Sequence, residues 1–196
     1  MKKYSFLFLC LFSFSFLSFN NHQDHVKVNL ESSSIKWIGS KISESHEGTI
    51  DLSSGKLVFD HGRLVGGEFI IDMNTIKNTD IESEKYSKKL DDHLKDEDFF
   101  NVSEYPKSFL KFTKVKKIED SYYEIVADLT IKGITHAISF GAEVKIKGTH
   151  FLATANIKID RTKWGIEYKS ASFFEYLGDK AILDEIILDV FLLSEK

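Results

Sequence analysis

Short runs of alternating apolar and polar residues recur from Ser33 onward, and this pattern constrains the fold more than any other feature of the chain. Residues two apart in a strand point to the same face of a sheet, so the alternation predicts strands with one apolar and one wet face. The runs are spaced as in an antiparallel barrel or sandwich and not as in strand-helix-strand units. The expected strands are residues 35–42, 48–52, 56–60, 64–73, 108–118, 122–131, 137–146, 151–159 and 185–193.

Turn-forming residues separate several of these runs. Ser53-Ser54-Gly55 and the pairs His61-Gly62 and Gly148-Thr149 are expected to form hairpin turns, since glycine supplies the positive φ that such turns need. Most connections between strands are therefore local, and the fold class is all-β.

One stretch departs from the two-residue period. Between Thr79 and Glu97, the residues Tyr86, Leu90 and Leu94 recur at every fourth position among many charges, and Thr79 and Glu82 have the spacing of a capping box. The pattern predicts one short amphipathic helix that covers an end or a side of the sheet.

The apolar faces of the expected strands define a candidate ligand-binding interior. A closed barrel of about eight strands is either filled by its own side chains or wide enough for one small or slender ligand, and sequence alone leaves both open. If a ligand is bound, the lipid-binding residues should be Phe69, Ile71, Met73, Leu110, Phe112, Leu129, Ile131, Leu188 and Val190.

The first residues have the layout of a secretory signal. Lys2 and Lys3 precede an apolar stretch over residues 6–19, and the chain turns polar at Asn20. This stretch is too short to span a bilayer, and we interpret residues 1–20 as a signal peptide and residues 21–196 as one barrel domain. Cys10 could alternatively be a lipid-attachment cysteine, although Leu9 before it is not a small residue.

Charge and motifs argue against several functions. The formal charge of −4 is spread along the chain, so nucleic acid is not an expected partner. Phosphate-binding loops, nucleophile elbows and zinc motifs were not found, and we expect no catalytic residues, no metal site and no required cofactor.

One histidine and one charged cluster are each open to two interpretations. His93, flanked by acidic residues, could act as a general base, or it could lie beside the apolar stripe of the helix and bond into the barrel rim. The cluster of Asp160, Arg161 and Lys163 could bind an anionic headgroup or form a salt bridge at a strand edge.

Four segments resemble the YceI-like family. Residues 90–100 (LDDHLKDEDFF), followed by Tyr105-Pro106, are similar to its D-x-HL…DFF…YP signature, and residues 128–136 (DLTIKGITH) resemble its LTI-x-G-x-T block. Residues 64–73 and 159–165 resemble the family's V-x-G-x-F strand and its late R-x-x-aromatic-G motif. Leu90 departs from the pattern, since many members carry arginine there.

This resemblance implies a lipocalin-like antiparallel β-barrel, secretion to the periplasm, and an apolar isoprenoid lipid as the ligand, for example the tail of an isoprenoid quinone. The family has no shared catalytic residue set, so the resemblance implies a binding protein and not an enzyme. The alternatives are a stress-response or protein-interaction module with a filled barrel, and an enzyme that uses His93. A homodimer through an exposed strand edge also stays open.

The signal layout makes a prediction about the mature protein. Because the apolar stretch ends before Asn20, the secreted chain should be soluble and should begin near residue 19 to 23. N-terminal sequencing of the exported protein checks this. A lipidated Cys10, or an intact Met1 in the cytoplasmic fraction, would contradict it.

Overall fold

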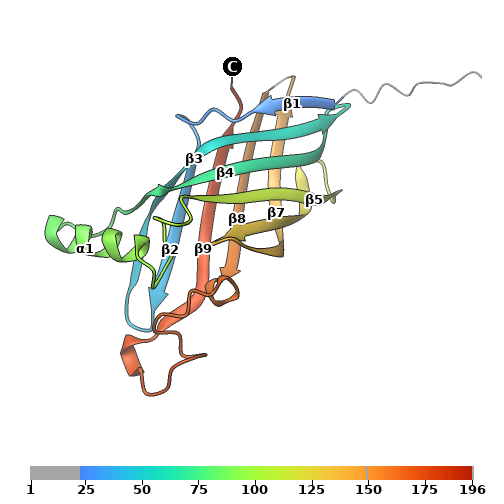
Figure 1. Ribbon diagram of the computed structural model, residues 1–196. Coiled ribbons are helices and arrows are strands. Elements are labelled where there is room, and N and C mark those ends of the chain that lie inside the picture. The colour runs from blue at the N-terminus through green and yellow to red at the C-terminus, as the bar shows by residue number, and fades with distance from the viewer. Residues whose placement is uncertain (1–22, 149, 196) are drawn as a thin grey trace, which may run out of the picture.

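The computed structural model describes residues 23–148 and 150–195, which form nine strands, one α-helix and two short 3-10 helices (Figure 1). The elements are β1 (Gln23–Lys27), β2 (Ser34–Lys41), β3 (Ser45–Asp60), β4 (Arg63–Asn78), α1 (Glu84–Lys95), β5 (Lys107–Lys117), β6 (Tyr122–Ile131), β7 (Ile134–Lys147), β8 (His150–Asp160), η1 (Arg161–Trp164), η2 (Gly178–Lys180) and β9 (Ile182–Leu193). The proposed signal peptide lies outside the described residues.

The strands form one antiparallel sheet that closes on itself. Its order is β1-β3-β2-β9-β8-β7-β6-β5-β4, and a further pairing of β3 with β4 joins the two sides. Strands β2 to β9 make a closed eight-stranded barrel, and β1 is an extra strand paired to β3. The predicted all-β, lipocalin-like barrel with one short helix is confirmed.

The turn predicted at Ser53-Ser54-Gly55 is wrong, because β3 runs through it as one continuous strand. The register against β4 shifts between Leu52 and Ser54, which marks a bulge. Gly55 serves packing here, since a Cβ on it would lie only 2.8 Å from Cδ1 of Phe69. A glycine that admits a neighbouring ring looks the same in sequence as a glycine that makes a turn.

The other predicted turns fall where expected. His61 and Gly62 have φ of 48° and 72° and connect the paired residues Asp60 and Arg63. Gly148 has φ of 63° and lies between Lys147 and His150, which are also paired, while Thr149 is outside the described residues. Strand β1 was not predicted, because most of its side chains are exposed and polar and show no alternation.

Helix α1 lies outside the barrel wall at one end (Figure 1), and the predicted single helix is confirmed. The capping box predicted at Thr79 and Glu82 is wrong, since the helix begins at Glu84 with Ser83 at the cap position. The backbone N–H of Thr79 instead donates to the carbonyl of Glu47, which holds this part of the chain against β3. In the described part of the chain, no helix is long and apolar enough to cross a membrane.

A buried asparagine at the end of β4 attaches this helix to the barrel. The backbone N–H and the side-chain amide of Asn78 both donate to Oδ1 of Asp91, each at 2.7 Å, and the amide also donates to the carbonyl of Ser87 at 2.9 Å. Leu94 is buried and Leu90 packs on the core, so the helix covers part of one end of the barrel. Of the predicted stripe, Tyr86 remains exposed.

We therefore predict that Asn78→Ala loosens the helix. Removing the amide leaves Asp91 without its bonds from that side chain, a loss of about 1–3 kcal/mol for a buried polar group. Denaturant unfolding should show the lower stability, and amide hydrogen exchange should rise in residues 84–95. Lys88→Ala, which removes a solvent-exposed contact to Asp92, is the matched control and should change little. Unchanged exchange in the helix of Asn78→Ala would refute this docking role.

Candidate functional site

The barrel encloses an apolar cavity with a volume of about 180 Å³. On the same scale a cavity needs roughly 10–15 Å³ to hold one water molecule. The cavity therefore exceeds the space of a single water molecule many times over, and it is the candidate binding site.

The cavity lies between two clusters of buried side chains. The helix-end cluster contains Trp37, Leu94 and Phe99, and the β1-end cluster contains Leu57, Leu64 and Ile125. Six residues touch both clusters and remain only partly buried, although they point into the barrel: Leu52, Leu110, Ile138, Phe140, Ala155 and Val190. All six line the cavity.

All nine residues predicted to bind a ligand line this cavity, namely Phe69, Ile71, Met73, Leu110, Phe112, Leu129, Ile131, Leu188 and Val190. They come from β4, β5, β6 and β9, whose inward faces follow the predicted alternation. The sequence-based set therefore shares one space.

Other lining residues were missed by the sequence analysis. Trp37 on β2, Ile138 and Phe140 on β7, and Ile157 and Ile159 on β8 also face inward. The same two-residue period identifies them within strands that were expected. Phe99 and Phe100 line the cavity at the helix end from the segment that follows α1, and no period in the sequence indicates where these two rings point.

The lining carries little polar chemistry. Among the described residues, Ser108, Thr154 and Arg161 are the lining residues with polar side chains. Ser108 donates to Sδ of Met73 at 3.1 Å, so its hydroxyl is already engaged. No histidine, aspartate or glutamate in the described part of the chain lines the cavity. The site can hold an apolar molecule by shape and burial, and it offers no acid-base group to it.

One end of the cavity reaches the surface near the start of β9. Leu183 lines the cavity and is 47% exposed. Gly39 lines it as well, and a Cβ added there would meet no atom within 4 Å. These two residues lie at the same rim, because Gly39 on β2 pairs with Ile186 on β9. We refer to the opening beside Gly39 and Leu183 as the mouth.

Arg161 is almost completely buried near the mouth. Its guanidinium donates to the carbonyls of Ile166, Ile182 and Leu183 at 2.6, 3.0 and 3.1 Å, and it lies 3.4 Å from Oδ1 of Asp184. Burial lowers the pKa of Arg161, while the charges of Asp184 and Asp160 oppose that shift. Arginine keeps its charge when it is buried in a protein. Its donors join Ile166, at the start of the segment 165–181, to Ile182 and Leu183, which directly follow that segment.

The other members of the predicted charged cluster lie elsewhere. The carboxylate of Asp160 accepts bonds from the backbone and hydroxyl of Thr162, where it caps η1, and Lys163 is exposed. Asp160, Arg161 and Lys163 therefore do not converge on a common anion site.

His93 packs at the rim between aromatic rings. Its ring meets Phe99 and Tyr168 edge-on, with centroids 4.9 and 4.7 Å apart. Its Nε2 lies 3.6 Å from Asp98, and His93 is not part of the cavity lining. The structure thus places His93 at the rim, as the packing interpretation expects, and away from any molecule in the cavity.

Two solved structures share this fold. A crystal structure of Burkholderia cenocepacia BcnA superposes with a TM-score of 0.70 at 18% identity, over 86% of this chain and 99% of that one. A polyisoprenoid binding domain from Saccharophagus degradans, implicated in plant cell wall breakdown, gives a TM-score of 0.62 at 14% identity, over 87% of this chain and 97% of that one. At these identities the likeness establishes the fold.

Sequence comparison gives the family. A UPF0312 protein of Photorhabdus laumondii is 29% identical over 114 residues, which is 54% of each chain. The chain spans about half the length of the curated relatives that it matches. The YceI-like domain profile matches residues 21–192, nearly the whole barrel and its closing segments. The chain therefore belongs to the YceI-like domain family.

Proposed function

We propose that this chain is a secreted, periplasmic lipid-binding protein that holds a polyisoprenoid, for example an isoprenoid quinone, in the barrel. The observation that carries the proposal is the cavity, whose lining is apolar except for three side chains. The similar Saccharophagus fold is described as polyisoprenoid binding, which supports the same ligand class for this chain.

The energetics favour a ligand that is long and apolar. Burial of apolar surface contributes about 25 cal/mol per Å², and the lining extends from Leu57 and Leu64 at one end to Leu94 and Phe99 at the other. An empty apolar cavity of this volume costs on the order of 4 kcal/mol, which an occupant would relieve. A protein selected only for a filled core would gain by closing this space.

The role we propose is non-catalytic and needs no cofactor. Acid-base chemistry needs a titratable group within hydrogen-bond reach of the bound molecule, and the described lining offers no carboxylate or imidazole. Arg161 is the charged residue in the described lining, and its N–H groups donate to backbone carbonyls.

Lipid extraction tests the proposal directly. Protein purified from cells should release an isoprenoid lipid into organic solvent, and mass spectrometry should identify it. An empty extract, together with no thermal shift on addition of prenyl quinones, would reject the function and favour the interaction-module alternative.

The cavity also predicts different effects for two adjacent residues. Ile71 faces the cavity, whereas Ile70 is on the outer face of the same strand, so the two positions form a matched pair. Ile71→Trp should abolish or sharply reduce co-purified lipid at a modest loss of stability, because the new ring occupies ligand space. Ile70→Trp should leave the lipid content unchanged.

Thermal melts of the ligand-free variants distinguish a ligand site from a packed core. If the interior were filled, Ile71→Trp would be overpacking and would cost about 1–3 kcal/mol. A strongly destabilised Ile71→Trp protein, from a parent without lipid, would therefore refute the cavity assignment. Unchanged lipid content in Ile71→Trp would refute the position of the ligand.

A further inference from the structure

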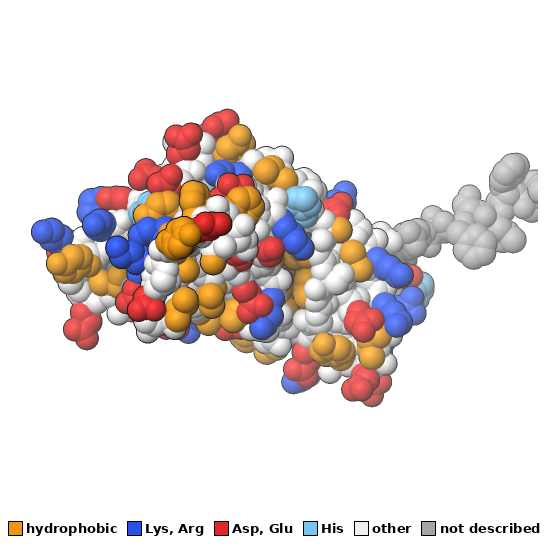
Figure 2. All heavy atoms as spheres, turned by 90° about the horizontal axis from the view of Figure 1, so that it is seen from below, with side chains coloured by type: hydrophobic (Ala, Val, Ile, Leu, Met, Phe, Trp, Pro, Cys, Tyr) orange, Lys and Arg blue, Asp and Glu red, His pale blue; other side chains and the backbone are white. Residues whose placement is uncertain are grey.

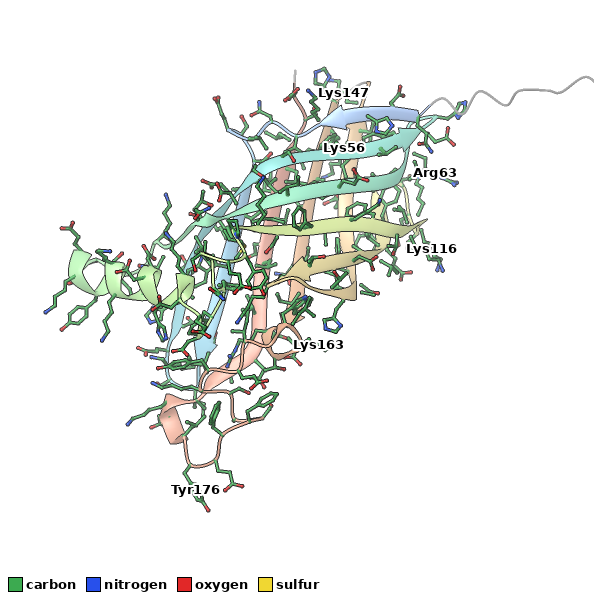
Figure 3. The ribbon with its side chains drawn as sticks, in the orientation of Figure 1. Lys56, Arg63, Lys116, Lys147, Lys163 and Tyr176 are labelled. Carbon is green, nitrogen blue, oxygen red and sulfur yellow. The ribbon has the colours of Figure 1, made fainter. Side chains whose placement is uncertain are left out.

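The segment between η1 and η2 displays three aromatic side chains to solvent. Phe173 and Phe174 are each about half exposed at 51% and 49%, and Tyr176 is 99% exposed. Figure 3 shows Tyr176 at the tip of this segment, below the barrel. In Figure 2, which views the molecule from below, apolar side chains gather on this end. We refer to residues 171–177 as the aromatic loop.

The backbone of this loop holds its side chains outward at an energetic cost. Tyr176 has φ of 62°, in the left-handed region that bulky residues seldom occupy. The ring of Tyr176 gains nothing from burial in return, since it makes almost no contact with the rest of the protein. Strain of this kind concentrates at sites of function.

The base of the loop is held in place. The hydroxyl of Ser172 donates to Oδ2 of Asp184 at 2.6 Å, and the N–H groups of Phe173 and Phe174 donate to the carbonyl of Ser170, which is fully buried. Asp184 also contacts the buried guanidinium of Arg161. The aromatic side chains are thus presented by an ordered turn and not by a loose linker.

This ordered base places the loop beside the cavity mouth. Asp184, which binds the loop through Ser172, directly follows Leu183, the exposed residue of the lining. The N–H of Ile182, another lining residue, donates to the carbonyl of Lys169 at the start of the segment. The loop is therefore attached beside Leu183, whose side chain is exposed and also lines the cavity.

We propose that the aromatic loop docks the mouth onto the surface of a phospholipid bilayer, from which the ligand enters and to which it returns. This inference rests on the proposed function, because a nearly insoluble lipid needs an apolar path between membrane and cavity. Aromatic side chains favour the interface between headgroups and acyl chains. A bilayer fits this loop because its exposed rings lie beside the mouth of an apolar interior.

The charges around the loop indicate which kind of bilayer it fits. Lys163, Lys169 and Lys180 are balanced by Glu167, Glu175 and Asp179 in the same segment. A surface without net charge gains little from anionic headgroups, so docking should occur on zwitterionic lipid and should depend only weakly on salt. Arg63, Lys116 and Lys147 lie at the opposite end of the barrel, away from the loop (Figure 3).

Vesicle binding by the full mature protein tests this proposal. The parent protein should co-sediment with phosphatidylcholine–phosphatidylethanolamine vesicles, in low and in high salt. Replacing Phe173, Phe174 and Tyr176 with serine should weaken binding about tenfold or more, since it removes the inserted apolar area. Tyr176→Asp alone should also weaken it and cannot disturb packing, because the ring is fully exposed.

Two control variants test whether membrane binding depends on the aromatic loop and not on other parts of the protein surface. Phe109→Ser changes an exposed ring on the barrel wall and should bind vesicles as the parent does. Arg63→Glu combined with Lys147→Glu should also bind normally. Loss of binding in this double variant, no binding by the parent, or unchanged binding in the triple serine variant would each overturn membrane docking by the loop.

Ligand measurements distinguish failure of this proposal from failure of the proposed function. A prenyl quinone offered in detergent micelles should bind the triple serine variant as it binds the parent, while transfer from vesicles should slow. Equal transfer rates in both proteins would overturn the docking role even if the cavity binds the quinone. Vesicle binding needs no ligand, so it can be measured if the cavity proves empty.

Discussion

Closure of the sheet by pairing of β3 with β4 is the constraint on which the rest of the structure depends. Both strands have 16 residues, and their register runs from Gly48 opposite Asn78 to Asp60 opposite Arg63, with bulges that bend the ribbon. Without this pairing, the apolar inner faces would open along an edge. With it, every inward side chain from β2 to β9 faces the same enclosed space.

Close approach within this corner depends on glycine. A Cβ on Gly48 would lie 1.9 Å from the carbonyl of Lys77, and a Cβ on Gly67 would lie 2.8 Å from the ring of Phe112. Backbone and rings could not come this near if larger residues occupied either site. The strands can therefore bend sharply enough to close, and large side chains gather at both ends of the barrel while the middle of the interior stays open.

The two-residue period explains why much of the barrel was predictable from sequence. Alternation is local, so Phe69, Ile71 and Met73 could be assigned to one face without any knowledge of the partner strands. It could not show whether those side chains fill the interior, because Phe112 in a cavity wall and Phe59 in a packed cluster have the same sequence signature. Gly55 was misinterpreted for a related reason, since its close neighbour Phe69 is brought to it only by the tertiary pairing.

Arg161 shows what lies beyond the reach of sequence patterns. Its charge and neighbours suggested a surface or headgroup role, yet its main partners are carbonyls of residues 166, 182 and 183, which only the folded segment brings together. Five donors in a rigid fork can satisfy several converging carbonyls at once, which lysine cannot do with the same geometry. The chain between η1 and β9 can then leave the barrel, expose its aromatic side chains and return beside the mouth. Arg161 supplies the hydrogen bonds to the carbonyls that this excursion buries. A charged residue inside an apolar barrel end is stable here because it replaces the hydrogen bonds that a regular strand would have supplied.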